Sequence, residues 1–385
     1  MRRVRLLDLS AEYKLFRDEI RAAVDAVLES QHFIGGPAIG ALESALADRL
    51  GVKHAIAVNS GTDALLCALM TLGVGQGDEV ILPSFTFFAT AGSVARLGAT
   101  PVFVDIDPRT FNVNPEKLEA AMTEKTKAIL VVHLFGQCAE MDTINAMAQK
   151  RGLPVIEDAA QAIGASYRNR SACGLGTMAC VSFYPTKNLG GFGEGGMVFT
   201  NDERLGAVAR QLRVHGESQR YVHERIGGNF RLDTMKAAIL LVKLNRLDTF
   251  TDRRRRNAEL YDELLADSAV TTPFVAEANR HVYHQYSILC DRRDELADHL
   301  RERGVDTGVY YAVPLHLQTC FASLGWNRGS LPVTEKACAN ILSLPCHPML
   351  SDEDVSYAAS CVSEFLGGNS SPIATPANAK SLSSG

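Results

Sequence analysis

The stretch SFYPTKNLGGFGEGG, residues 182–196, decides how the rest of the chain is interpreted. Lys187 is its only charged residue before Glu194, and apolar segments at 178–183 and 197–200 lie on either side. Both segments have the pattern of short strands joined by a glycine-rich turn region. A lysine held near a packed core loses solvation, so its pKa falls below the ordinary value of about 10.4. The neutral amine is nucleophilic and can condense with an aldehyde to form a Schiff base.

The ordinary alternative is a solvated lysine on a surface loop, because most lysines lie in water. Two features favour a chemical role for Lys187. The glycines of the stretch let the backbone approach a bulky group closely. Earlier segments of the chain also end in groups that suit a phosphate and a planar aromatic ring.

Length and charge limit the classes of protein to consider. A chain of 385 residues is expected to form about two domains. The formal net charge of −5 argues against nucleic acid as the main partner. The basic run at residues 253–256 is predicted to be a solvated helix face, because acidic residues follow at 259, 262 and 263.

Cysteine usage and hydropathy point to a cytoplasmic protein. The nine cysteines are odd in number and form no CxxC pair, which favours reduced thiols over disulfides or a zinc site. No metal-ligand cluster of recognisable spacing is present. The basic N-terminus lacks the apolar core of a signal peptide, and no window approaches the ~20 apolar residues of a spanning helix.

Short apolar strands alternate with helical patterns through the first half of the chain. The strands are expected at 55–58, 80–82, 101–104, 129–132 and 154–156. Near-continuous apolar strands of this kind are typical of a mostly parallel sheet that helices cover on both faces. Ligands bind such sheets at the carboxyl ends of the strands. Ser60, the phenylalanine cluster at 85–88, His133 and Asp158 all follow strand ends.

Three of these strand ends suit parts of pyridoxal 5′-phosphate (PLP). Ser60-Gly61-Thr62 opens a helix whose free N–H groups favour an anion, although an ordinary helix cap fits as well. One ring of the phenylalanine cluster can stack on a planar cofactor, or all three rings can be core. Asp158 can keep a pyridine nitrogen protonated and so make the ring an electron sink, or it can simply cap the next helix.

The pattern changes after residue 200. A helix is expected from 205 to 214, an exposed loop from 215 to 228 and a further helix from 234 to 247. We predict a large domain over 1–248, a smaller C-terminal α/β domain over 249–367 and a disordered tail over 368–385. In the run at 309–316, Tyr311 and His316 are candidates for lining a substrate pocket, although His316 also suits a structural role.

With these residues in place, the chain resembles the DegT/StrS family of PLP-dependent aminotransferases, which act on nucleotide-linked keto-sugars. The resemblance extends from about residue 33 to residue 366. Six motifs carry it in order: VNSGTDAL at 58–65, PSFTFFATA at 83–91, PVFVDIDP at 101–108, EDAAQAIGA at 157–165, SFYPTKNLGGFGEGG at 182–196 and GGNFRLD at 227–233.

The resemblance implies the α/β architecture called fold type I, with a mostly parallel seven-stranded sheet in the large domain. It also implies a homodimer whose active sites lie at the subunit interface. By motif position, Lys187 is the Schiff-base lysine and Asp158 pairs with the pyridine nitrogen. Gln161 contacts the ring hydroxyl and Phe87 stacks on the ring.

The same resemblance assigns the phosphate contacts. Gly61, Thr62 and Ser182 hold the phosphate with Ser60 beside them, and Asn229 reaches it from the other subunit. Tyr184 is a candidate substrate contact. Relatives that aminate C4 of the sugar often have histidine at this position, so Tyr184 favours amination at C3.

The predicted activity is transfer of an amino group, with L-glutamate as the donor by family habit, to a nucleotide-linked keto-sugar at C3. Amination at C4 and amination of a keto-cyclitol remain alternatives, because the same cofactor machinery serves different pockets. Related sugar dehydratases carry histidine at the lysine position, so Lys187 argues against dehydration. A PLP-binding regulator without turnover is a third alternative. It is disfavoured by the acidic net charge and by a single clear helix in residues 1–30.

Overall fold

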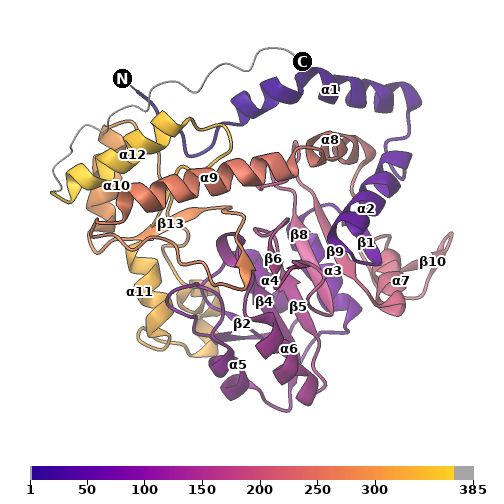
Figure 1. Ribbon diagram of the computed structural model, residues 1–385. Coiled ribbons are helices and arrows are strands. Elements are labelled where there is room, and N and C mark those ends of the chain that lie inside the picture. The colour runs from indigo at the N-terminus through magenta and orange to yellow at the C-terminus, as the bar shows by residue number, and fades with distance from the viewer. Residues whose placement is uncertain (1, 368–385) are drawn as a thin grey trace.

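The computed structural model describes residues 2–367 (Figure 1). The disordered tail predicted at 368–385 therefore lies outside the described residues. The chain opens with two helices, α1 (Leu9–Ser30) and α2 (Pro37–Leu50). Asp8 caps α1 by accepting a hydrogen bond from the N–H of Ala11, and Pro37 starts α2 at a position where no N–H is needed.

The large sheet has seven strands in the order β1-β9-β8-β5-β4-β2-β3. It is mostly parallel, as predicted, and only β9 runs against its neighbours β1 and β8. The strands are β1 (His54–Val58), β2 (Glu79–Pro83), β3 (Thr100–Val104), β4 (Thr126–Val132), β5 (Val155–Asp158), β8 (Met178–Ser182) and β9 (Gly196–Thr200). Most of their residues are buried because helices cover both faces.

Helices cover the sheet on both sides, as the alternation along β1 shows. Ala55 and Ala57 pack into one core together with α2, α6 and α8, whereas Ile56 and Val58 pack into another with α3, α4 and α7. These helices are α3 (Gly61–Thr71), α4 (Phe88–Arg96), α6 (Met141–Lys150), α7 (Glu203–Leu212) and α8 (Thr234–Leu244), and a short α5 (Pro115–Ala121) precedes β4. Strands β5 and β8 therefore run through the middle of the large domain, with their carboxyl ends side by side.

A third core belongs to the C-terminal part. It is built around helix α9 (Leu247–Leu265), which crosses the upper half of the view in Figure 1, and the pair β13 (Tyr286–Leu289) and β14 (Ile341–Leu344). Helices α10 (Arg293–Glu302) and α12 (Asp352–Phe365) complete it. In contrast, α11 (Pro332–Asn340) and the 3₁₀ turns η2 (Leu315–Leu317) and η3 (Thr319–Leu324) bury their apolar side chains in the core of the large domain that contains Ile56 and Val58. The domain boundary near residue 248 stays a prediction. However, Val4 is buried in this core and its N–H donates to the carbonyl of Gly304, so the extreme N-terminus packs with the C-terminal part.

Short strands complete the structure. Strand β6 (Ser166–Tyr167) pairs with its neighbour β7 (Arg170–Ser171), and its pairing with β12 (Asn279–Arg280) joins the two parts of the chain. Residues 215–228 were predicted as an exposed loop, and they contain a hairpin of β10 (Glu217–Gln219) and β11 (Val222–His223). This exposed hairpin projects from the edge of the molecule in Figure 1.

Arg254 corrects the prediction of a solvated basic face on α9. Its neighbours Arg253 and Arg256 are exposed, but Arg254 is buried. The guanidinium donates to the carbonyl oxygens of Tyr283 and Cys346, both at 3.2 Å, and to that of His284 at 3.4 Å. The charge pattern along α9 predicted solvation because it contains only the neighbouring residues. The carbonyl groups that Arg254 binds come from distant segments of the chain.

We expect Arg254→Met to destabilise the protein by roughly 3 kcal/mol, because buried carbonyl groups would lose their donor. Arg253→Met on the same helix is the matched control and should change the free energy of unfolding by less than about 0.5 kcal/mol. Chemical denaturation of both variants measures the difference. Equal stabilities for the two variants would contradict the assigned role of Arg254.

Within residues 2–367, no helix combines the length and the apolar character needed to cross a membrane. The same residues contain no group of three or more His, Cys, Asp or Glu side chains arranged to hold a metal ion. Each of the nine cysteines falls in this range and is a free thiol, and only Cys320 is exposed.

Candidate active site

Lys187 lies on the connection between β8 and β9, at the carboxyl end of β8. Its backbone N–H donates to the carbonyl of Tyr184 at 2.8 Å, which closes a tight turn. Gly190 sits directly against the backbone of Pro185, so a side chain there would collide with the carbonyl. Glycine at residue 190 thus lets the loop fold back on itself just after Lys187.

Lys187 and Asp158 form the electrostatic centre of the site. Burial lowers the pKa of the Lys187 ammonium to about 8, and the negative charge of Asp158 opposes this shift only in part. Burial likewise raises the pKa of Asp158, against hydrogen bonds from Thr90 and Ala160 and the charge of Lys187. An amine with a pKa near 8 is neutral often enough at physiological pH to act as a nucleophile or a base.

The lowered pKa makes Lys187 a cost to the stability of the cofactor-free protein. In the unfolded chain the lysine holds its proton up to about pH 10.4, whereas the folded protein releases it near pH 8, so stability rises between these values. We expect Lys187→Met to raise the free energy of unfolding at pH 7 by up to roughly 3 kcal/mol, with the gain disappearing above about pH 10. Denaturant titrations at pH 7 and pH 10 measure it; an equal difference at both values would contradict the shift.

Asp158 is held at the end of β5 by two hydrogen-bond donors. The hydroxyl of Thr90 donates to Oδ2 at 2.8 Å and the N–H of Ala160 donates to Oδ1 at 3.2 Å. The side chain is only 6% exposed and Thr90 is fully buried. The two donors fix the carboxylate while each oxygen keeps a free lone pair, so Asp158 can accept a further hydrogen bond from a cationic N–H.

A second group of residues surrounds the N-terminus of α3. A Cβ on Gly61 would lie 2.7 Å from the Cβ of Ser182, so glycine allows this close approach. The hydroxyl of Ser60 accepts from the N–H of Asp63 at 3.0 Å, and that of Ser182 accepts from the N–H of Tyr184 at 3.2 Å. Because both hydroxyl oxygens act as acceptors, their protons remain available to donate. Together with the N–H groups that open α3 beside Thr62, they form a cradle for an anion.

Three more predicted site residues form a connected group. Gln161 accepts from the N–H of Phe135 at 2.8 Å and donates from Nε2 to the hydroxyl of Tyr311 at 3.1 Å. The Tyr311 ring centroid lies 6.2 Å from that of Phe87, and Phe87 is 56% exposed. Tyr311 therefore keeps its hydroxyl proton for a ligand, and Phe87 offers an open ring face at the start of α4.

The remaining predicted residues lie in different surroundings. Tyr184 is exposed on the lysine loop, where it can meet a substrate. Asn229 is also exposed, and the next residue, Phe230, accepts a hydrogen bond from the N–H of Asn59 beside the cradle.

His316 is buried, with Nδ1 2.7 Å from the hydroxyl of Ser84 and Nε2 3.3 Å from Glu335. Since both ring nitrogens have partners within the chain, this geometry favours the structural alternative for His316.

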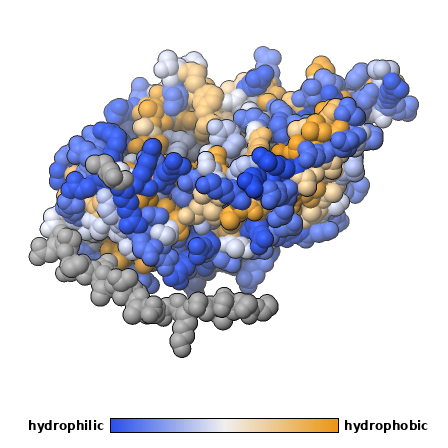
Figure 2. Space-filling model, turned by 90° about the horizontal axis from the view of Figure 1, so that it is seen from above, coloured by the Kyte–Doolittle hydropathy of each residue, from blue (hydrophilic) through white to orange (hydrophobic). Residues whose placement is uncertain are grey.

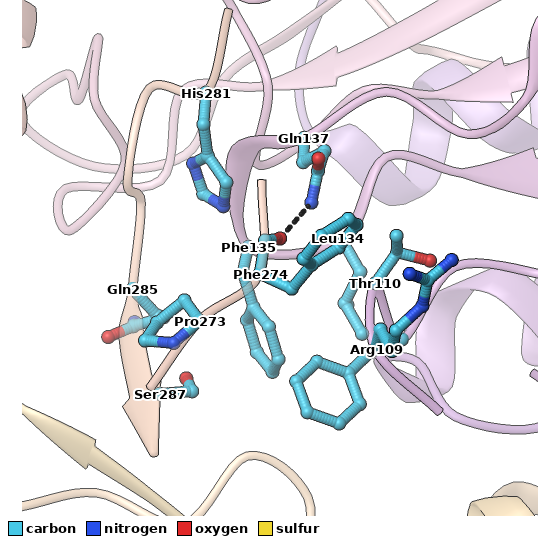
Figure 3. A pocket seen from close by; sticks show the side chains of 11 residues that line it. Arg109, Thr110, Leu134, Phe135, Gln137, Pro273, Phe274, His281, Gln285 and Ser287 are labelled. Carbon is cyan, nitrogen blue, oxygen red and sulfur yellow. Dashed lines mark hydrogen bonds between the residues drawn. The ribbon is translucent and has the colours of Figure 1, made fainter. Parts of the chain in front are cut away.

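Two buried features near the site do not bind a cofactor. His133 pairs with Glu157 at 2.9 Å, and both side chains are fully buried, so His133 anchors the sheet instead of facing a ligand. The cavity in Figure 3 lies beside Phe135, where Gln137 donates to the carbonyl of Phe274 at 2.9 Å. Its volume of about 10 Å³ is room for about one water molecule and excludes a cofactor.

Sequence reasoning missed Thr90 and the contacts of Asn188. The position of Thr90 inside a motif was visible, but nothing in the local pattern indicates that its hydroxyl reaches a residue 68 positions away. Asn188 follows Lys187 directly, and its partner His284 lies in the C-terminal part of the chain. Only the fold brings these pairs together.

Residues 15–363 match the DegT/DnrJ/EryC1/StrS aminotransferase family. A protein called pleiotropic regulatory protein, from Geobacillus stearothermophilus, is 51% identical over 94% of this chain and 98% of its own length. UDP-2-acetamido-2-deoxy-3-oxo-D-glucuronate aminotransferase of Pseudomonas aeruginosa is 47% identical over 91% of this chain and 97% of its own. The crystal structure of DesV from S. venezuelae has a TM-score of 0.93 at 42% identity, covering 95% of this chain and 99% of that one.

The seven-stranded sheet, the family match and the likeness to solved aminotransferase structures define a PLP-dependent aminotransferase of fold type I. The chain belongs to the DegT/DnrJ/EryC1/StrS aminotransferase family, whose characterised relatives include aminotransferases of nucleotide-linked keto-sugars.

The residues present fit PLP. The buried carboxylate of Asp158 with its free lone pairs suits the pyridinium N–H, and the half-buried Lys187 amine of lowered pKa suits the aldehyde. The cradle at Ser60, Gly61 and Ser182 offers hydrogen-bond donors to a phosphate. The donors are the free protons of the two serine hydroxyls and the unpaired N–H groups at the N-terminus of α3.

Proposed function

We propose that the protein transfers an amino group from an amino acid, in our prediction L-glutamate, to C3 of a nucleotide-linked keto-sugar. The placement of the half-buried Lys187, whose ammonium has a lowered pKa, near the buried carboxylate of Asp158 carries the proposal, because it supplies the base and the fixed charge that transamination needs. The relative in Pseudomonas aeruginosa, named for a 3-oxo sugar nucleotide, supports amination at C3. Tyr184 at the position where 4-aminating relatives often have histidine gives the same indication.

When bound, the cofactor supplies an electron sink that acidifies the proton on the α-carbon of the amino donor. In the half-reaction with the amino donor, the neutral Nζ of Lys187 would be the base that accepts this proton. In the half-reaction with the sugar, its protonated form would be the acid that delivers a proton to the carbon receiving the amino group. Asp158, held by Thr90 and Ala160, keeps a proton on the ring nitrogen. The neighbouring rings of Phe87 and Tyr311 would line the part of the site that holds the pyridine ring of the cofactor. Tyr311 has a hydroxyl proton left to donate to the sugar.

Conversion of glutamate to 2-oxoglutarate tests the proposal when it is measured against a panel of 3-keto and 4-keto sugar nucleotides. Turnover with a 3-keto substrate, and slower turnover with its 4-keto isomer, is the expected result. Preference for the 4-keto isomer or for a keto-cyclitol would favour those alternatives. Absence of turnover with every substrate, despite full loading with PLP, would instead favour a regulatory role, which the name of the Geobacillus relative keeps in view.

The proposal includes a homodimer in which Asn229 of one subunit completes the phosphate site of the other. Large apolar side chains are exposed on the hairpin region and beyond it, with Ile226 at 92% and Tyr221 at 78%. Figure 2 shows hydrophobic patches among hydrophilic residues on the face seen from above. Exposed apolar surface of this kind is typical of a protein contact.

Mixing two inactive variants tests the shared site. If Asn229 acts across the interface, dimers that combine Lys187→Ala with Asn229→Ala contain one intact site, and the mixture should regain up to about a quarter of wild-type activity. Sedimentation measures the dimer itself. No recovery after subunit exchange would place Asn229 at the site of its own chain.

The proposed partners are small molecules and a second copy of the chain. The net charge of −5 gives no reason to include nucleic acid. The nine free cysteines suit a reducing compartment, so the proposal retains a cytoplasmic location.

A further inference from the structure

His284 is a buried polar side chain that none of the roles above uses. It is 7% exposed and lies just before β13, in a segment that crosses the large domain beside the lysine loop. The N–H of His284 donates to the carbonyl of Phe135 at 2.8 Å, and the N–H of Val282 donates to that of Gly136 at 3.0 Å. Figure 3 shows the same segment near Phe135, with His281 and Gln285 on it.

The hydrogen bonds around Asn188 define which imidazole nitrogen carries the proton. Asn188 donates from Nδ2 to the carbonyl of Val282 at 3.1 Å, so its Oδ1 is the acceptor. Nδ1 of His284 lies 3.1 Å from this Oδ1 and must therefore be the donor. Asn188 is thus gripped at both ends of its amide by the segment 282–284.

The surroundings also keep the imidazole uncharged. Burial lowers the pKa of His284 well below its usual value, and the positive charges of Lys187 and Arg254 lower it further. Arg254 also donates to the carbonyl oxygens of Tyr283 and His284, which fixes the segment from its other side. A neutral ring serves as a donor to Asn188 and adds no positive charge beside Lys187.

We propose that His284 is a positioning residue for Lys187, because it clamps the next residue, Asn188, between its own Nδ1–H and the carbonyl of Val282. The inference rests on the role given to Lys187 in the proposed function. Asn188 holds the backbone from which the lysine side chain starts. Loss of the clamp would let the loop move, admit water around the amine and misplace Nζ relative to the reacting carbon. Misplacement of about 1 Å can reduce a rate by about a hundredfold.

The clamp also links the two parts of the chain. Tyr283 packs in the core of the C-terminal part, whereas Asn188 and Lys187 belong to the loop of the large sheet. A shift of the C-terminal part would therefore change the position of the loop that carries Lys187. This link is absent from any motif around Lys187, since it is formed by a residue 96 positions away from Asn188.

Three variants test the clamp. His284→Phe keeps a ring of similar size and removes the donor, whereas His284→Asn places an amide N–H close to the position of Nδ1. Asn188→Ala removes the acceptor from the other side. The first measurement uses cofactor-free protein: the pH dependence of Lys187 labelling by an amine-reactive reagent, followed by mass spectrometry, reports the apparent pKa of the amine. The second is kcat/KM for transamination of the cofactor-loaded enzyme.

We expect His284→Phe and Asn188→Ala to move the labelling profile of Lys187 by about one pH unit toward that of an ordinary lysine and to lower kcat/KM about 10- to 100-fold. His284→Asn should restore both to within a few fold, and the double variant should lose no more than either single variant. An unchanged labelling profile in folded His284→Phe would overturn the proposal, as would equal losses in His284→Asn and His284→Phe. If the wild type lacks transaminase activity, the labelling profiles still decide on the clamp, and only the proposed function fails.

Discussion

Lys187→Ala is expected to remove the visible absorption band of the PLP-loaded protein and to lower turnover by about four orders of magnitude or more. The variant loses both the amine that bonds the cofactor aldehyde and the base that moves the proton. Its effect should exceed that of any other single substitution at the site. Absorption spectra, mass analysis after borohydride reduction and single-turnover kinetics measure the two losses separately.

Two controls separate chemistry from folding. Lys187→Arg keeps a long cationic side chain, but a guanidinium stays protonated and is expected to be as inactive as alanine. Small primary amines added to Lys187→Ala should restore part of the turnover, because a neutral amine can enter the space left by the side chain and move the proton. Full transamination by either variant without added amine would rule out Lys187 as the catalytic lysine.

The parts of the site predicted from sequence share a local signal. Lys187 stands out because it is the single charge in a glycine-rich turn between two apolar strands, and Asp158 because it ends an apolar strand. The mostly parallel direction of the strands followed from their alternation with helices, and the strand pairing in the large sheet confirms it. In such segments the pattern of a few neighbouring residues determines the structure, so a sequence is sufficient.

The errors and omissions have the opposite cause. Arg254 carries the same charge pattern as its exposed neighbours, and only the arrival of three carbonyl groups from residues 283, 284 and 346 makes it a buried donor. Thr90 and His284 were missed because their partners lie far away in the sequence. The hairpin in residues 215–228 was taken for a loop because its two strands are very short and exposed. Long-range contacts therefore decide what local patterns leave open.

Asp158→Asn should retain PLP and lower kcat by about 10²- to 10³-fold, a loss comparable to removing one charge-stabilising contact in other enzymes. The N–H of Ala160 is a fixed donor, so the asparagine oxygen should take the Oδ1 position and its NH₂ group the Oδ2 position. The Thr90 hydroxyl can rotate to accept from that NH₂. The site then stays satisfied, but it no longer offers a negative charge to the ring nitrogen.

Stability separates this loss of rate from damage to the fold. Burial raises the pKa of Asp158, which means that folding disfavours its charged form, and a neutral amide avoids that cost at neutral pH. The melting temperature of cofactor-free Asp158→Asn at pH 7 should therefore equal or exceed that of the wild type while the rate falls. Thr90→Val is the matched comparison, because it removes one donor and leaves the charge, so its kcat should fall only about tenfold. Wild-type kcat in Asp158→Asn, or an equal loss in Thr90→Val, would show that the charge at residue 158 is not what drives the reaction.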